Sequence, residues 1–218
     1  SSLMFIGATM AIAGVILAIQ NRTLDLPDRR YEVAHGLLSL LSKDMPPNAP
    51  LAIALEFKPH DHRTKFVREG RVGRWTVKYY VDPWLKVRGR LADGTKFSVS
   101  MIEKIQRRRC QKVSASGKTK HKTKNKISSE AIVSLAFKIN RYPEASKAYQ
   151  QAPQCIQLPA WAMIKSVKTN HNILTVRSTT DVKWSANRPG RSRAKLDGVN
   201  WLAMMFLSLY RLLHISRK

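Results

Sequence analysis

The stretch from residue 75 to residue 101 constrains the fold most strongly, because apolar and polar side chains alternate along it. Such alternation is typical of strands with one buried face. An Asp-Gly pair favours a tight turn with the glycine in a left-handed conformation. The sequence therefore predicts an antiparallel meander of three strands, residues 75–81, 85–91 and 95–101, with turns at Asp82-Pro83 and Ala92-Asp93-Gly94.

The register of this meander follows if each face keeps one character. Three-residue turns place Val87 opposite Val99, and a two-residue second turn would mix the two faces. The apolar pairs are then Val81 with Leu85, Tyr79 with Val87, Trp75 with Leu91, Val87 with Val99 and Leu85 with Met101, which makes Trp75 a core residue. The other face pairs Lys78 with Arg88, Arg90 with Lys96 and Tyr80 with Lys86.

The second face of the predicted meander is basic and contains no acidic residue. Like charges directly opposite each other destabilise a sheet by about 0.2–1 kcal/mol per pair. We therefore expect an external anion to neutralise this face, with a solvated face of splayed side chains as the alternative.

The whole chain has the same bias, with 39 Lys and Arg against 14 Asp and Glu and a formal net charge of +25. A charge of this size indicates a partner such as nucleic acid, an anionic membrane or an acidic protein. The only cysteines are Cys110 and Cys155, which excludes a disulfide framework and fits a reducing compartment.

Residues 3–19 form an uncharged apolar run, at the short end of what spans a bilayer. We expect a transmembrane helix in residues 1–22, with a cleavable signal peptide as the competing interpretation. Arg22, Arg29 and Arg30 follow the run, so the positive-inside tendency predicts a main domain on the cytoplasmic side. Small residues recur along one side of this helix and could mediate self-association: Gly7, Ala11, Gly14 and Ala18.

The remaining chain predicts a basic α+β domain over residues 23–182. Asp28 is a plausible N-cap for a helix that ends near Lys43. Residues 51–57 alternate as a strand, residues 127–140 fit either a helix or a strand, and residues 144–150 resemble a short helix. Residues 162–168 and 173–180 predict a second hairpin. The region around residues 103–126 is expected to be a polybasic mobile loop or an extended ribbon.

The C-terminal part is predicted as a basic linker over residues 183–198, followed by a helix over residues 199–218. Its apolar centre is short for a membrane span. We first expect an interfacial helix with Trp201 and Tyr210 at headgroup depth. A second span and a buried core helix are the alternatives.

No stretch matches a phosphate-binding loop, a dinucleotide fingerprint, a zinc-protease helix or a nucleophile elbow. The sequence therefore predicts no enzyme, no catalytic residue and no cofactor. His60 and His62 could hold a metal only with a third ligand, so solvated histidines are the preferred interpretation. Cys110 follows three arginines, which would favour its thiolate. Trp84 and Trp184 are candidates for stacking on bases or lying at headgroups.

These features predict an α+β protein with a membrane helix at the N-terminus and an amphipathic or membrane-associated helix at the C-terminus. We expect a non-enzymatic, membrane-anchored protein that binds an anionic surface, first of all lipid headgroups. A tethered nucleic-acid-binding protein and a structural subunit of a larger membrane assembly are the alternatives. The expected anion-binding residues are Lys78, Lys86, Arg88, Arg90, Lys96, Arg107, Arg108, Arg109, Lys112, Lys118, Lys120, Lys122, Lys124, Lys126, Arg188, Arg191 and Arg193.

Overall fold

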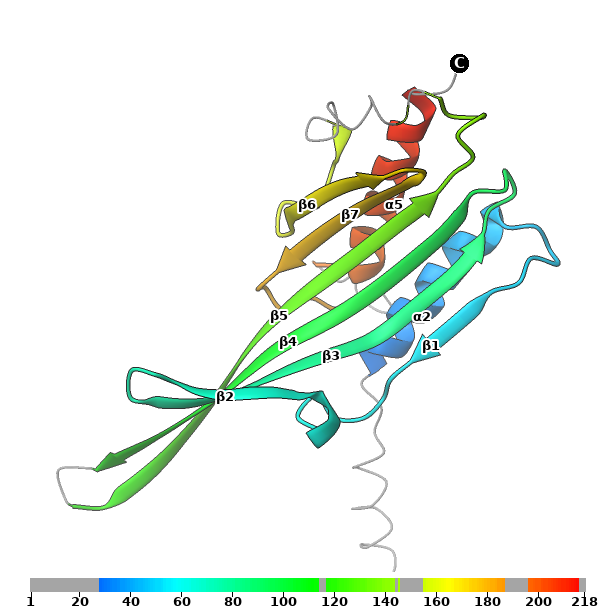
Figure 1. Ribbon diagram of the computed structural model, residues 1–218. Helices are drawn as coiled ribbons and strands as arrows, with labels where there is room; N and C mark the ends of the chain where they lie inside the picture. The colour runs from blue at the N-terminus through cyan, green and yellow to red at the C-terminus, as the bar shows by residue number, and fades with distance from the viewer. Residues whose placement is uncertain (1–27, 114–116, 144, 146–154, 187–195, 216–218) are drawn as a thin grey trace, which may run out of the picture.

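The computed structural model describes residues 28–113, 117–143, 145, 155–186 and 196–215. This part of the chain forms an antiparallel sheet with two helices on one face, which confirms the α+β class (Figure 1). The helices are α2 (Asp28–Leu41) and α5 (Gly198–Ile215), and the short 3-10 turns are η1 (Ser42–Asp44) and η2 (Arg63–Lys65). The strands are β1 (Ala52–Leu55), β2 (Phe66–Val72), β3 (Trp75–Arg90), β4 (Lys96–Val113), β5 (Thr119–Ala136), β6 (Met163–Asn170) and β7 (Ile173–Thr180).

The sheet has the order β1-β3-β4-β5-β7-β6, and β2 pairs with the first half of β3. Its long strands extend beyond the two helices as a twisted arm, at the lower left in Figure 1. We use the name arm for the paired residues 104–113 of β4 and 119–128 of β5. Strands β2 and β3 flank the root of this arm.

The second hairpin of the predicted meander is confirmed. Leu85 pairs with Met101, Val87 with Val99 and Arg90 with Lys96. Gly94 has a φ of 86°, a conformation that glycine adopts without steric cost.

The first predicted hairpin is wrong, because β3 runs straight through Asp82 and Pro83. The register shifts between Pro83 and Leu85, and a proline is tolerated at such a bulge. The side chain of Asp82 is buried rather than displayed at a turn, since Arg30 and Lys65 both pair with it. Trp75 is half-buried and pairs with Val72 in β2, so it lies outside the core in which we expected it.

The polybasic region is strand rather than mobile loop over its described residues. Pairing runs without interruption from Lys96 opposite Ala136 to Val113 opposite Thr119. The buried ends of β4 and β5 fix the register, and the basic ends continue it as an extended ribbon. Residues 127–136, which fitted either a helix or a strand, belong to β5.

Three other predicted elements are present. The helix after residue 28 ends at Leu41, the strand over residues 51–57 is reduced to β1, and the second hairpin consists of β6 and β7. Its turn is tighter than expected, since Asn170 already pairs with Ile173 and His171 takes a φ of 47°.

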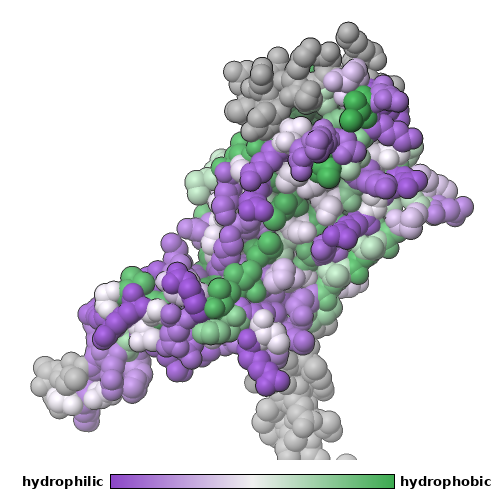
Figure 2. Space-filling model, in the orientation of Figure 1, coloured by the Kyte–Doolittle hydropathy of each residue, from purple (hydrophilic) through white to green (hydrophobic). Residues whose placement is uncertain are grey.

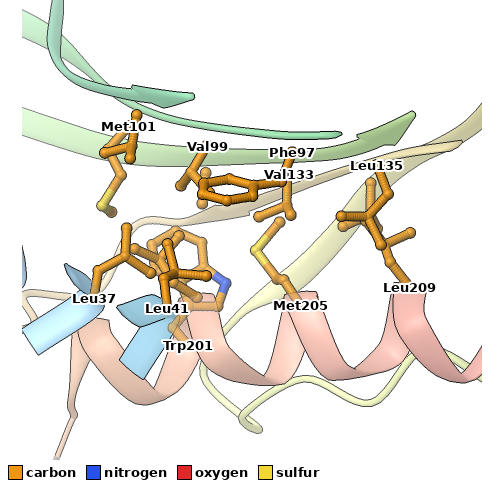
Figure 3. Close-up of a cluster of buried hydrophobic side chains, with 14 of the residues drawn as sticks. Leu37, Leu41, Phe97, Val99, Met101, Val133, Leu135, Trp201, Met205 and Leu209 are labelled. Carbon is orange, nitrogen blue, oxygen red and sulfur yellow. The ribbon is translucent and has the colours of Figure 1, made fainter. Parts of the chain in front are cut away.

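The core lies between the sheet and the two helices, as Figure 3 shows. Leu37 and Leu41 of α2 point toward the sheet, and so do Trp201, Met205 and Leu209 of α5. They meet inward-facing side chains of β4 and β5: Phe97, Val99, Met101, Val133 and Leu135.

The C-terminal helix α5 is therefore a core helix that packs on the sheet, which was the third of the alternatives for this segment. Trp201, expected at headgroup depth, is fully buried, and it donates a hydrogen bond through Nε1 to Ser178 Oγ at 3.0 Å. Tyr210 is partly buried and donates to Asp93 Oδ2 at 2.6 Å. An interfacial position is therefore wrong for Trp201, because the protein itself covers it, whereas Tyr210 keeps part of its surface exposed.

Among the described residues, no helix combines the length and apolar character needed to cross a membrane. The predicted membrane helix at residues 3–19 and its small residues lie outside the described part of the chain. So do residues 144 and 146–150 of the predicted short helix and residues 187–195 of the predicted linker.

Candidate anion-binding surface

The sheet has an outer face, which we define as the face turned away from α2 and α5. Odd-numbered residues of β4 such as Val99 and Met101 are buried against the helices, so the even-numbered residues lie on the outer face. The confirmed register adds β3 residues at matching positions. The expected residues Lys86, Arg88, Arg90 and Lys96 therefore share this face and are all exposed.

The arm continues the outer face with a row of cations. Lys120, Lys122, Lys124 and Lys126 occupy alternate positions of β5, so their side chains leave the strand on the same side, and Lys118 precedes the row. Arg108 lies opposite Lys124, and Lys112 lies opposite Lys120. Figure 2 shows mostly hydrophilic groups over this end of the molecule.

Three of the predicted binding residues point to the other side of the arm. Lys78 pairs in register with Arg107, and Thr76 with Arg109, at odd positions of β4. Two of them have acidic neighbours: Lys78 lies 3.6 Å from Glu69, and Arg107 lies 2.6 Å from Asp61. The structure thus divides the expected set between two faces. Arg188, Arg191 and Arg193 lie outside the described residues.

Acidic residues are scarce on the arm. No Asp or Glu occurs between Glu103 and Glu130. Lys126 reaches Asp181 at 3.5 Å, and Lys104 reaches Glu130 at 2.5 Å. Among the described residues, no carboxylate lies within ion-pair distance of Arg108, Lys112, Lys120, Lys122 or Lys124.

A cation cluster that the sequence did not reveal lies where the arm meets the body. Glu130 of β5 is almost completely buried and binds Lys104 of β4, Lys165 of β6 and Arg177 of β7. These cations are scattered over the sequence, and only the sheet order brings them together. Burial raises the pKa of Glu130, but the hydrogen bonds from Lys104 and Lys165 outweigh it, so the pKa lies below its ordinary value.

A second charged cluster is buried at the arm root and is structural in character. Arg30 donates to Asp82 Oδ2 at 2.6 Å and to Glu103 Oε2 at 3.3 Å, while Arg29 also pairs with Glu103. Lys65 lies 2.8 Å from Asp82 and donates to the Lys58 carbonyl. These contacts fix the first turn of α2 and η2 to β3 and β4.

The tryptophans proposed for stacking are part of this structural region. Trp84 and Trp184 are both buried, with ring centroids 6.5 Å apart. The Arg29 guanidinium lies 4.3 Å from the centre of the Trp184 ring. They are therefore covered by protein and present no stacking surface for bases or headgroups.

A groove of about 640 Å³ lies between the helices, at the end of the sheet away from the arm. It is lined mainly by apolar side chains, among them Leu40, Phe206 and Leu207.

Asp93 lies on the wall of this groove and accepts hydrogen bonds from Thr95, Tyr142 and Tyr210. Burial raises the pKa of Asp93, but these hydrogen bonds together bring it below its ordinary value. Burial, followed by the bond to Asp93, raises the pKa of Tyr210.

The described residues contain no group of three or more His, Cys, Asp or Glu side chains arranged to hold a metal ion. His62 uses Nδ1 to cap the Thr64 amide of η2. Cys110 is a free, buried thiol opposite Lys122 in the arm.

No protein-family model matches the chain, and no curated protein or solved structure shows significant similarity to it.

Proposed function

We propose that this protein is a non-enzymatic, membrane-anchored protein whose outer face binds the phosphate groups of anionic lipids. The observation that carries the proposal is the row of cations aligned on one face of the arm, in which Lys126 pairs with Asp181 while Lys120, Lys122 and Lys124 have no carboxylate in contact among the described residues. Arg108 opposite Lys124 and Lys112 opposite Lys120 are unfavourable pairs for a sheet by itself. An anionic surface would neutralise these cations and remove the repulsion between them, and this relief would favour binding.

The position of α2 supports lipid headgroups as the anion. Its first turn is held at the arm root by Arg29 and Arg30, so the chain enters the described domain at the end that carries the arm. If residues 3–19 form the membrane helix that their sequence predicts, the arm lies close to the same bilayer. By the charge rule, that bilayer surface is the cytoplasmic one.

The electrostatic term is large enough for peripheral contact. A basic residue near an anionic bilayer contributes about 1 kcal/mol, and the contribution falls off within a Debye length of about 8 Å at physiological salt. Several arm cations acting together would hold the domain against the membrane surface, and the predicted membrane helix at residues 3–19 would keep the domain close to that surface.

Nucleic acid is the second candidate, and the shape of the arm favours it. The major groove of duplex DNA admits a two-stranded β-ribbon, and the outer part of the arm is such a ribbon. Binding would then release counterions and fall steeply with salt.

The test uses the full chain reconstituted in phosphatidylcholine nanodiscs. Fluorescent vesicles of phosphatidylcholine, with or without phosphatidylglycerol, are offered in solution, with excess duplex DNA or single-stranded RNA as competitor. We expect capture only of vesicles that contain phosphatidylglycerol, and we expect capture to persist in the presence of competitor.

A matched pair of double variants makes the test specific. Lys122→Glu with Lys124→Glu should strongly weaken capture, whereas Lys43→Glu with Lys138→Glu makes the same charge change at exposed lysines away from the arm and should preserve most of it. Capture lost to nucleic acid would establish the second candidate instead. Binding to neither vesicles nor nucleic acid would overturn both and point to an acidic protein in a larger assembly.

A further inference from the structure

Glu130 gathers one cation from each of three strands on the outer face of the sheet. We name Glu130, Lys104, Lys165 and Arg177 the Glu130 cradle. One carboxylate faces three cations, so the cradle keeps an excess of positive charge.

The exposure of these cations separates the cradle from the buried cluster at the arm root. There, Arg30, Lys65, Asp82 and Glu103 are all buried, and Arg29 is the one member of that cluster with a partly exposed side chain. In the Glu130 cradle the carboxylate is 4% exposed, whereas the three cationic side chains are 43–45% exposed. The carboxylate thus lies beneath the cations, and the cations border solvent.

The cradle is also preorganised. Lys104 Nζ and Lys165 Nζ bind the same oxygen, Glu130 Oε2, at 2.5 Å and 2.9 Å. Arg177 contacts Oε1 through Nε at 3.3 Å, which leaves the terminal nitrogens of its guanidinium for another acceptor. Holding flexible side chains in place beforehand lowers the entropy cost of binding a ligand.

Two hydroxyl groups border the cradle. Thr179 is the cross-strand partner of Glu130, and Ser128 is the partner of Lys104. Their oxygens lie 3.3 Å apart. Both hydroxyls already donate to backbone carbonyls, Thr179 to Ser129 at 3.1 Å and Ser128 to Thr180 at 3.4 Å, so the donors left for an oxyanion are those of the three cations.

We infer that the Glu130 cradle binds a phosphomonoester group, and that the outer face consequently prefers monoester lipids such as phosphatidic acid over diester lipids. A phosphomonoester carries a charge of about −1.5 to −2 near pH 7 and three terminal oxygens, which suit three cations. A phosphodiester has a single charge and fewer free oxygens. This selectivity rests on the proposed binding of lipid headgroups. The arm contributes affinity for any anionic lipid and does not distinguish monoesters from diesters.

The experiment compares vesicles that contain phosphatidic acid with vesicles that contain phosphatidylglycerol, matched in surface potential. The full chain in phosphatidylcholine nanodiscs captures them, and the measured quantity is the ratio of the two affinities. We expect about a tenfold preference for phosphatidic acid, the size of one charge-assisted hydrogen-bond contribution. Arg177→Gln and Lys165→Gln should each reduce this ratio to about twofold or less.

Two controls separate the cradle from the arm. Lys168→Gln removes a charge from an exposed position of β6 near Lys165 and should leave the ratio unchanged. The arm variant with Lys122→Glu and Lys124→Glu should weaken both affinities and preserve the ratio. A preference that survives in both cradle variants, or a wild-type ratio near one, would overturn the inference while leaving the proposed function intact. Failure of the wild type to capture either lipid would overturn the proposed function itself.

Soluble glycerol 3-phosphate then distinguishes the source of the phosphomonoester. Displacement of phosphatidic acid vesicles only at millimolar concentration would assign the site to a lipid headgroup. Displacement at micromolar concentration would assign it to a soluble phosphomonoester and overturn the lipid preference as its role.

Discussion

Arg108 and Lys124 lie directly opposite each other on neighbouring strands, with both side chains on the outer face of the arm. Two cations in this position repel each other, and Arg108 donates to a neutral acceptor, the Gln106 side-chain oxygen, at 2.6 Å. The repulsion within this pair lowers the stability of the sheet, and the same two positive charges attract anions.

Lys124→Glu should therefore stabilise the folded protein while impairing its binding. The substitution converts a repulsive cross-strand pair into an attractive one, which we expect to raise the free energy of unfolding by about 1 kcal/mol. Urea denaturation followed by tryptophan fluorescence would measure this change, and vesicle capture should fall in the same variant. Lys124→Gln, which only removes the charge, should have a free energy of unfolding between those of the wild type and Lys124→Glu. A Lys124→Glu protein less stable than the wild type would contradict the register of the arm.

Asp82→Ala should be among the most damaging substitutions in the described domain. It leaves Arg30 and Lys65 buried without their shared carboxylate. Breaking a buried ion pair in this way costs about 3–5 kcal/mol. Glu69→Ala is the control, because its pair with Lys78 is about half exposed on both sides and should contribute less than about 1 kcal/mol. Similar urea midpoints for the two variants would argue against the buried cluster as a fixed point of the fold.

Substitutions in α5 distinguish the face that packs on the sheet from the face that does not. Leu209 is fully buried, whereas Leu207 is 61% exposed. Leu209→Ala should destabilise the protein by about 2–5 kcal/mol, because it removes core contacts and leaves a cavity. Leu207→Ala should change stability by about 0.5 kcal/mol or less. Equal effects would mean that α5 does not lie on the sheet as described.

The hydrogen bonds to Asp93 should make the domain sensitive to acid. Its folded pKa lies below the ordinary value of 3.8, so its contribution to stability is fully present above that value and is lost as the pH falls through the folded pKa. Tyr210→Phe removes one of the bonds that lower this pKa, and we expect acid unfolding to begin at a higher pH. Circular dichroism during acid titration would show the shift. Tyr79→Phe, which lies in β3 away from this site, should leave the transition unchanged.

The alternation and spacing of apolar residues were sufficient to predict the elements that are defined by residues close together in the sequence. The hairpin around Gly94 and the hairpin of β6 and β7 follow from alternation and turn residues close in sequence. The helix α2 follows from the spacing of Ala34, Leu37 and Leu41. The basic outer surface was also foreseeable for Lys86, Arg88 and Arg90, because alternation in a strand assigns neighbouring residues to opposite faces.

The long-range partners decided the rest, because the free energy of a buried charge or apolar face depends on what covers it. Asp82-Pro83 has the composition of a turn, but ion pairs with Arg30 and Lys65 keep it inside a continuous strand. The apolar stripe of α5 fits lipid as well as protein, and the sheet is what covers Trp201. The Glu130 cradle arises from strands β4, β6 and β7 meeting around one carboxylate of β5. No sequence pattern encodes that meeting, since the order of strands in a sheet is a property of the whole fold.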